Sequence, residues 1–326
     1  MLDEGMYSMN NDIAVLDSTQ VAKLIGRIDV LSAMRRMFLA LGQEKAVQPP
    51  QLRNPFPNGQ GNFISYLGTL AEERVFGAKL SPYIPRPEGA LVTAWTLMMS
   101  MDDGQPRLLC DSGQLTAERT AGTTALAVDL LAPSQVSKLA VVGVGRLGQA
   151  HVRHVSALRE WGDIRLYAPN IDALPVSEQQ ALRDLDPRVS IHTELASAVD
   201  DADVILLCTS AGHTVLDPAV LKKPALITSI CTNAPLAHEV PPESLLNMSV
   251  YCDYRATTPD SAGEMRLAKD QHGWLPESIY GDLPELMTGA ARLPDPERHT
   301  FFRSIGLGLE DIAIANELYQ LHMKNN

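Results

Sequence analysis

Three glycines spaced as Gly143-x-Gly145-x-x-Gly148 are the residues whose types and spacing point most directly to chemistry. An apolar run at residues 139–142 precedes them and apolar residues at helical spacing follow, which predicts a strand, a tight turn and a helix. In such a unit the first glycine permits the turn, the second lets the backbone approach a pyrophosphate, and the third lets the helix pack on the strand. The helix N-terminus then faces the anion. We therefore predict a dinucleotide site, the alternative being a glycine turn that only relieves tight packing.

The residues after the next predicted strand bear on the choice of dinucleotide. NAD-specific sites usually place Asp or Glu there to bind the ribose 2′-hydroxyl, whereas this chain has Tyr167-Ala168-Pro169-Asn170. Without a carboxylate nothing repels a 2′-phosphate, and Arg146 in the glycine loop could pair with that group. Asn170 could equally bond the hydroxyl. The pattern predicts NADPH or NADH as the cofactor.

Two cations, Lys79 and Arg119, stand out by their context. Lys79 lies near the end of the run VFGAKL, and Arg119 lies in LTAERTAGTTALA, ahead of the predicted cofactor strand. Taken alone, a lysine at a strand edge and an arginine on a helix are usually surface charges. Small residues flank Arg119, however, and these surroundings suit an arginine fork that reaches into a cleft for a carboxylate.

Length and composition bound the class of protein. The 326 residues, 45% of them hydrophobic and 20% charged, suffice for about two domains with ordinary globular cores. The formal charge of −12 and the lack of Lys/Arg runs argue against a nucleic-acid partner. The first residues show no signal pattern and no apolar stretch is long enough to span a bilayer. We expect a cytoplasmic protein with no membrane partner.

Cysteines and histidines show no metal-binding spacing. The four cysteines lie in or beside apolar runs and are predicted to be reduced core thiols: Cys110, Cys208, Cys231 and Cys252. His151 and His154 could share a helix face, but the expected cofactor helix is a poor place for a metal. We expect no metal site.

Apolar runs between residues 139 and 253 recur at the intervals of an open α/β sheet. After the strand that precedes the glycine loop, the expected strands are residues 164–167, 189–192, 204–208, 225–230 and 250–253. The run VILLC at 204–208 is apolar throughout, as in a parallel strand buried on both faces. The fold class is α/β, with a Rossmann-type doubly wound parallel sheet in a domain that spans residues 132–302.

The N-terminal part has a different pattern. A strand at 13–16 precedes a short helix that Asp17 or Ser18 caps, and a longer helix follows. One face of that longer helix carries Val30, Met34, Met37, Phe38 and Leu41. The expected strands are residues 63–67, 75–80, 91–99 and 107–111, with a hairpin turn at 103–106. This pattern predicts an α+β domain with a mainly antiparallel or mixed sheet.

A helix over residues 116–131 is expected to lead into the Rossmann-type domain. A terminal helix that could pack back on the first domain is indicated by Leu309, Ile312, Ile314 and Leu318. The α+β domain, for substrate binding and dimerisation, is therefore expected to comprise residues 1–131 and 303–326.

Several segments resemble the ornithine cyclodeaminase/mu-crystallin family, which includes cyclodeaminases, an archaeal-type alanine dehydrogenase and ketimine reductases. The resemblance covers nearly the whole chain: GAKL at 77–80, GQP at 104–106, LTAERTAGTTALA at 115–127, the glycine loop, and FFRSIGLGLEDIAIA at 301–315. It implies that Arg119 and Lys79 hold a substrate carboxylate beside the nicotinamide, with Arg53 as a third cation. It also suggests a homodimer built through the N-terminal domains.

The same resemblance implies further contacts, matched more by spacing than by distinctive motifs. Expected cofactor contacts, besides the three glycines, Arg146 and Asn170, are Thr93, Arg119, Leu147, Thr209 and Ser304. Ile305 is an expected substrate contact.

Two departures from the cyclodeaminase pattern favour a reductase. Asn233, in the segment SICTNAP, stands where cyclodeaminases carry a proton-shuttling aspartate, and we count it as a catalytic position. The strand NFISYLG at 62–68 lacks the glutamate of those enzymes. The chain is thus similar to the ketimine reductases, which act on a small cyclic imino acid, Δ1-pyrroline-2-carboxylate, and often on its six-membered homologue. An ornithine cyclodeaminase and a mu-crystallin-like binding protein with little turnover remain as rivals.

Overall fold

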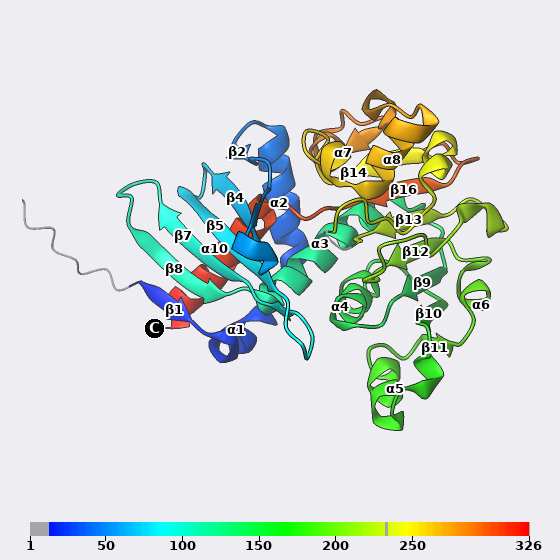
Figure 1. Cartoon of the computed structure of the whole chain (residues 1–326), viewed down its shortest axis with the longest axis horizontal. Helices are drawn as coiled ribbons and strands as arrows, with labels where there is room; N and C mark the ends of the chain where they lie inside the picture. Colours follow the sequence, from blue (N-terminus) through cyan, green and yellow to red (C-terminus); the bar gives the residue numbers. More distant parts are fainter. Residues whose placement is uncertain (1–12, 232–233, 326) are drawn as a thin grey trace, which may run out of the picture. The chain divides into compact units, whose positions relative to one another are not determined.

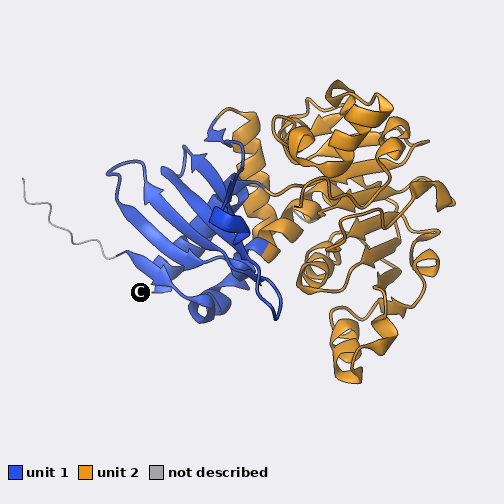
Figure 2. Ribbon diagram, viewed as in Figure 1, with its two compact units in different colours: residues 1–28, 45–116, 307–326 blue, residues 29–44, 117–306 orange. Residues whose placement is uncertain are grey.

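The computed structural model describes residues 13–231 and 234–325. By contacts the chain divides into two compact units, which Figure 2 distinguishes by colour. Unit 1 comprises Met1–Ile28, Lys45–Thr116 and Leu307–Asn326, and unit 2 comprises Asp29–Glu44 and Ala117–Gly306. Each unit is built around one eight-stranded sheet (Figure 1).

The sheet of unit 1 is mixed, as predicted. Its order is β1-β8-β7-β5-β4-β2, with β3 paired to β4 and β6 to β5. The pairings are antiparallel except for the parallel pair β1–β8. The strands are β1 (Ala14–Leu16), β2 (Ala46–Val47), β3 (Leu52–Pro55), β4 (Asn62–Leu70), β5 (Val75–Ile84), β6 (Leu91–Val92), β7 (Trp95–Ser100) and β8 (Pro106–Asp111).

The strand expected over residues 91–99 is wrong as one element, because the structure divides it into β6 and β7. Both pieces pair with β5 in the same register. Pro82 of β5 lies at the interruption and has no backbone N–H to donate to the ladder. The hydroxyl of Ser81 instead donates to the carbonyl of Thr93 at 3.1 Å.

The helices of unit 1 lie where the sequence predicts them. Helix α1 (Ser18–Ile25) begins at Asp17, whose carboxylate accepts a hydrogen bond from the Gln20 backbone N–H at 2.8 Å. Helix α10 (Gly308–Asn325) packs on β4 and β5 of the same unit. A Cβ at Gly308 would lie 2.4 Å from the Leu67 backbone nitrogen, so this close approach requires glycine. The four apolar residues predicted for this helix are buried.

The sheet of unit 2 confirms the Rossmann-type prediction. Its strands pair in parallel in the order β11-β10-β9-β12-β13-β16-β14-β15. They are β9 (Lys138–Val142), β10 (Asp163–Tyr167), β11 (Val189–His192), β12 (Val204–Leu207), β13 (Leu226–Ser229), β14 (Ser249–Cys252), β15 (Gly281–Asp282) and β16 (Thr300–Arg303). Strands β15 and β16 were not predicted from the sequence. Strand β16 comes last along the chain but lies between β13 and β14 in the sheet.

Eight helices of the described chain lie wholly or mostly in unit 2. They are α2 (Val30–Gly42), α3 (Gly113–Leu131), α4 (Arg146–Val155), α5 (Val176–Arg183), α6 (Leu195–Val199), α7 (Thr258–Ser261), α8 (Gly263–His272) and α9 (Leu283–Thr288). The predicted apolar face of α2 is buried. Contacts group α2 and most of α3 with unit 2, whereas the sequence-based limits place both helices in the first domain. That domain division stays a prediction.

The four cysteines are free and buried, which confirms their prediction as core thiols. Burial raises the pKa of the Cys110 thiol to about 12. None of the helices within the described ranges is both long and apolar enough to cross a membrane.

Candidate active site

The glycine loop joins β9 to α4 through a turn that only glycine permits. Gly143 has φ of +101°, and a Cβ on it would lie 2.5 Å from the Cys208 carbonyl oxygen. A Cβ on Gly148 would lie 1.9 Å from the carbonyl oxygen of Gly143. Both distances are shorter than real contacts, so the tight turn and the close packing of helix on strand require these two glycines.

Gly145 has different surroundings, because a Cβ built on it would have no heavy atom within 4 Å. It is the N-cap of α4, and no side chain caps that helix. The N–H groups of the first helical turn therefore remain available at the positive end of the helix dipole. These residues fit the pyrophosphate of a dinucleotide, which such a helix end binds.

The ribose end of the predicted site carries no carboxylate at residues 168–170. Asn170 follows β10 in a left-handed conformation, with φ of +59°, and is exposed. Arg146, the first residue of α4, is also exposed. Both side chains are therefore accessible for the 2′-substituent roles that the sequence predicts.

Helix α3, which carries Arg119, is fixed to α4 by polar contacts. Glu118 accepts hydrogen bonds from Arg153 at 2.8 Å and from His154 at 2.6 Å. Although burial acts to raise the pKa of Glu118, these two partners hold it below its usual value. Leu147 of α4 packs against a cluster of small residues: Ala117, Ala121 and Ala150.

His151 of α4 is a second link to α3. Burial lowers its pKa to about 4, so the ring is neutral near pH 7. Its Nδ1 lies 2.7 Å from the carbonyl oxygen of Leu147, which can only accept. The Nε2 atom is then left to accept from the Thr124 hydroxyl at 3.0 Å. A structural role therefore accounts for this histidine.

Arg119 is buried, with 4% of its surface exposed. Its guanidinium lies directly against Gly306, where a built Cβ would be 2.2 Å from Nη1. Gly306 has φ of +74°, a conformation that favours glycine. The surroundings therefore differ from those of a solvated surface arginine.

Asp253 holds the segment that contains Gly306. Its Oδ2 atom accepts from the Ser304 hydroxyl at 3.0 Å and from the backbone N–H groups of Ile305 at 2.7 Å and Gly306 at 3.0 Å. Two predicted contact residues, Ser304 and Ile305, thus lie in one turn beside Arg119. Asp253 was not among the predicted site residues, although a polar residue directly after a buried parallel strand is a signal for such a site.

Thr209 follows β12 and is held by Glu239, which is fully buried. Glu239 Oε1 accepts from the backbone N–H of Thr209 at 2.9 Å and from its hydroxyl at 2.6 Å. The Ser229 hydroxyl donates to Glu239 Oε2 at 2.7 Å. Glu239 therefore ties together the carboxyl ends of β12 and β13. Glu239 was not among the predicted site residues, since nothing in the sequence around it distinguishes it from a surface acid.

Lys79 is the charged centre of a cluster inside unit 1, with 1% of its surface exposed. Its Nζ atom lies 2.8 Å from Asp311 Oδ2 and 4.1 Å from the centroid of the Tyr66 ring. It also donates to the Thr116 hydroxyl at 3.4 Å. These partners compensate for removing the ammonium from water.

The remaining predicted site residues have varied placements. Arg53 is exposed on β3, and Thr93 is half-buried between β6 and β7. Asn233 lies outside the described residues. The structure gathers Arg119 and residues 304–306 within unit 2, whereas Lys79, Arg53 and Thr93 belong to unit 1.

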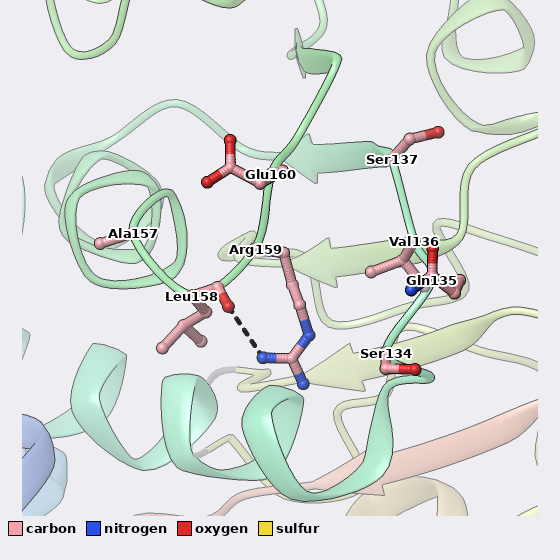
Figure 3. Close-up of a pocket in the computed structure, with 8 residues that line it drawn as sticks. All are labelled: Ser134, Gln135, Val136, Ser137, Ala157, Leu158, Arg159 and Glu160. Carbon is pink, nitrogen blue, oxygen red and sulfur yellow. Dashed lines mark hydrogen bonds between the residues drawn. The ribbon is translucent and has the colours of Figure 1, made fainter.

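A surface pocket lies near the amino end of β9, a central strand of the unit 2 sheet (Figure 3). Its lining comes from residues 134–137, which precede β9, and residues 157–160, which follow α4. Arg159 in this pocket is held by Asp129 at 2.8 Å. Because parallel α/β sheets bind ligands at the carboxyl ends of their strands, this pocket is distinct from the predicted dinucleotide site.

The doubly wound parallel sheet and the glycine loop define an α/β protein with a dinucleotide-binding domain. The model of the ornithine cyclodeaminase/mu-crystallin family matches residues 8–326. The chain belongs to this family, as the sequence motifs predict.

Similar proteins include oxidoreductases that act on amino acids or imines. The NAD(P)H-dependent anabolic L-arginine dehydrogenase of Pseudomonas aeruginosa is 55% identical over 307 residues, which cover 94% of this chain and 96% of that protein. The Delta(1)-pyrroline-2-carboxylate reductase of Bacillus cereus is 21% identical and covers 94% of this chain and 95% of its own length. The Thermococcus litoralis Delta(1)-pyrroline-2-carboxylate reductase, solved with NADH and L-proline, has a TM-score of 0.87 at 20% identity, covering 96% of this chain and 98% of that one. This last likeness shows the fold.

Proposed function

We propose that this chain is an NAD(P)H-dependent oxidoreductase that reduces the C=N bond of a 2-imino acid to give an amino acid. The observation that carries the proposal is the buried guanidinium of Arg119, on a helix fixed to the helix that begins at the glycine loop. A buried arginine fork is suited to a carboxylate, the group that every 2-imino acid carries.

Gly143, Gly145 and Gly148 are proposed to hold the pyrophosphate, while Leu147, Thr209, Ser304 and Thr93 contact the rest of the dinucleotide. When bound, the reduced nicotinamide supplies the hydride that the imine carbon accepts. Either NADPH or NADH serves, since residues 168–170 contain no acid that would repel a 2′-phosphate.

Arg119 is proposed to bind and orient the substrate carboxylate, with Arg53 as an additional cation. Lys79, whose ammonium lies 2.8 Å from Asp311, is proposed to assist Arg119 in holding the carboxylate and to supply or relay a proton. A charged Nζ can carry the proton that the product nitrogen requires, either directly or through water. Positioning, a carboxylate clamp and a proton source are sufficient for imine reduction.

The substrate we favour is the open-chain imine of arginine, formed from 5-guanidino-2-oxopentanoate and ammonia. The support is the 55% identity to the L-arginine dehydrogenase, against 21% to the pyrroline-2-carboxylate reductase. Reduction adds a hydride to the imine carbon and a proton to the nitrogen, which gives L-arginine and the oxidised cofactor.

A cyclic imino acid is the second candidate substrate. Reduction of Δ1-pyrroline-2-carboxylate gives L-proline, and reduction of Δ1-piperideine-2-carboxylate gives pipecolate. Residues 62–68 carry no carboxylate, and the amide of Asn233 cannot act as a general acid or base, so a ketimine reductase fits the chain better than an ornithine cyclodeaminase.

A substrate panel tests these alternatives. Purified protein is mixed with NADPH or NADH and either 5-guanidino-2-oxopentanoate plus ammonium or one of the two cyclic imines, and cofactor oxidation is followed by absorbance. Preferred turnover of the guanidino compound supports the first candidate, and preferred turnover of a cyclic imine supports the second. Ammonia release from ornithine at a comparable rate would contradict both, while binding without turnover would indicate a mu-crystallin-like binding protein.

We also propose that the chain forms a homodimer through the sheet of unit 1. The sheet face opposite α10 carries large exposed apolar side chains: Val15, Leu67, Leu80, Trp95 and Leu97. Cross-strand pairing places Leu80 beside Trp95 and Leu97 beside Leu109. An apolar face of this kind is typical of an interface. A solved archaeal alanine dehydrogenase with a TM-score of 0.86 is described as a dimer.

The dimer is tested by light scattering after size-exclusion chromatography. Leu97→Glu should shift the mass from dimer to monomer, whereas the exposed residue Leu293, in unit 2, provides a control in Leu293→Glu. A monomeric wild-type protein would contradict the proposal.

A cytoplasmic location also remains a prediction.

A further inference from the structure

We propose that Asp253 is a positioning residue that sets the geometry of Arg119 through the turn at residues 304–306. This inference rests on the proposed role of Arg119 in binding the substrate carboxylate. Unit 2 would then have two functions. Its glycine loop binds the dinucleotide, and Asp253, at the end of a strand of its sheet, positions Arg119 to bind the substrate.

The guanidinium of Arg119 lies against the backbone of Gly306. A Cβ on Gly306 would lie 2.2 Å from Nη1 and 3.1 Å from both Cζ and Nη2 of Arg119. The position of that backbone therefore limits where the guanidinium can lie. Glycine adopts the φ of +74° at Gly306 without strain and is free to adopt others, so the hydrogen bonds to this turn select its conformation.

Asp253 anchors the turn at residues 304–306 to the sheet. Asp253 directly follows β14, and Ser304 directly follows β16, its parallel neighbour, with Cys252 opposite Arg303 in the register. The Asp253 backbone N–H donates to the Arg303 carbonyl at 3.0 Å, which continues the ladder. From there the Asp253 carboxylate reaches the backbone of Ile305 and Gly306. The turn is thereby tied to the rigid sheet.

The hydrogen-bond donors around Asp253 require a carboxylate at this position. Oδ2 accepts from the N–H groups of Ile305 and Gly306, while Oδ1 accepts from the Tyr254 N–H at 2.9 Å and from the Thr258 hydroxyl. Backbone N–H groups can only donate, so both oxygens must accept. An asparagine would turn its NH2 group toward a donor on one side or the other, whichever way it is placed. Asparagine is nearly the same size as aspartate, so Asp253→Asn weakens the hydrogen bonds to the turn with little change in volume.

The matched control is Asp282, another buried aspartate of unit 2. Its Oδ1 accepts from the Glu285 N–H at 2.9 Å and its Oδ2 from the Arg255 N–H at 2.8 Å. Asp282→Asn thus creates the same mismatch with backbone donors without touching residues 304–306. Any general loss of stability caused by burying an unsatisfied amide should appear in both variants.

The experiment is a double-mutant cycle on kcat/KM for the imino acid that turns over fastest in the panel. We expect Asp253→Asn to lower kcat/KM about tenfold or more, since small displacements of a positioning group are costly, and to act mainly by raising KM. In an Arg119→Ala background the same change should have less than about a twofold effect, because the group that Asp253 positions is gone. Asp282→Asn should have the same small effect in both backgrounds.

Two outcomes contradict different parts of the account. If Arg119→Ala keeps wild-type kcat/KM, the proposed role of Arg119 fails, and this inference fails with it. If Arg119→Ala loses activity but Asp253→Asn behaves like Asp282→Asn, or lowers kcat/KM equally in both backgrounds, the proposed function stands and Asp253 is only structural. Should Asp253→Asn not fold, Thr258→Val removes one donor to Oδ1 and is expected to show the same non-additive pattern more weakly, and an additive pattern would overturn the inference.

Discussion

The ammonium of Lys79 and the carboxylate of Asp311 lie 2.8 Å apart, and both side chains are at most 2% exposed. Strand β5 supplies the lysine and helix α10 supplies the aspartate, which joins the terminal helix to the sheet of unit 1. An isolated buried charge is costly, so each partner makes the other tolerable.

The first prediction separates stability from activity at this ion pair. Asp311→Asn should lower the free energy of unfolding by about 3–5 kcal/mol, since it leaves the ammonium without its counter-charge. Replacing both partners by apolar residues, Lys79→Met with Asp311→Leu, should recover most of that loss in urea unfolding yet give no imine reduction. Recovered activity in the double variant would show that Lys79 is only structural. The exposed pair Lys45–Glu72 provides the control, where Glu72→Gln should cost less than about 1 kcal/mol.

The second prediction concerns Arg119. Arg119→Ala should lose about 2–5 kcal/mol of transition-state binding, or about 30- to several-thousand-fold in kcat/KM, because a charge-assisted pair in a desolvated site is removed. The Kd for NADPH, measured by fluorescence titration, should change far less. Arg119→Lys keeps the charge without the fork and should fall between the wild type and the alanine variant. A nearly unchanged kcat/KM would rule out a carboxylate-binding role.

The third prediction concerns cofactor choice. Asn170→Asp adds an acceptor for a 2′-hydroxyl and repels a 2′-phosphate, so the ratio of kcat/KM for NADH over NADPH should rise about tenfold, or about 1.4 kcal/mol. Asn58→Asp is a matched control, because Asn58 is also exposed and left-handed, with φ of +57°. An unchanged ratio in Asn170→Asp would show that Asn170 does not contact the ribose.

The fourth prediction is a pH dependence of stability from His151. Its folded-state pKa of about 4 lies below the usual 6.5, so the unfolded chain binds more protons in this window. Stability from the neutral ring is present above about pH 6.5 and is lost as the pH falls toward 4, by about 2 kcal/mol between pH 7 and pH 5. His151→Gln should remove this part of the slope in urea unfolding, and His213→Gln, at an exposed position, should not. Equal slopes in both variants would contradict the assignment.

Local patterns predicted most strands of both sheets but missed β2, β3, β15 and β16. Alternating and continuous apolar runs identify β4 and β12, and the Asp17 cap identifies the start of α1. Strand β16 was missed because its place between β13 and β14 depends on pairing with strands far away in sequence. The break between β6 and β7 depends on Pro82 of the neighbouring strand, which the run at 91–99 does not reveal.

The sequence predicted several residues of the candidate site but not their burial or their hydrogen-bond and ion-pair partners. The glycine spacing is sufficient to predict the tight turn, because a Cβ at Gly143 or Gly148 would clash with adjacent backbone. Lys79 and Arg119 are typical surface residues by type, and only the partners Asp311 and Gly306 reveal their burial. Asp253 and Glu239 act on backbone and hydroxyl groups brought together by the sheet, which single-sequence motifs cannot show.

The most direct test of imine reduction is isotopic. The protein is incubated with 5-guanidino-2-oxopentanoate, ammonium and NADPH that carries deuterium at the transferable position, and separately with Δ1-pyrroline-2-carboxylate, and the amino acid products are analysed by mass spectrometry. We predict an amino acid with one deuterium at its α-carbon, formed in equal amount to the NADPH consumed, with L-arginine as the preferred product. Unlabelled product, or ammonia and proline from ornithine without net cofactor oxidation, would contradict the account.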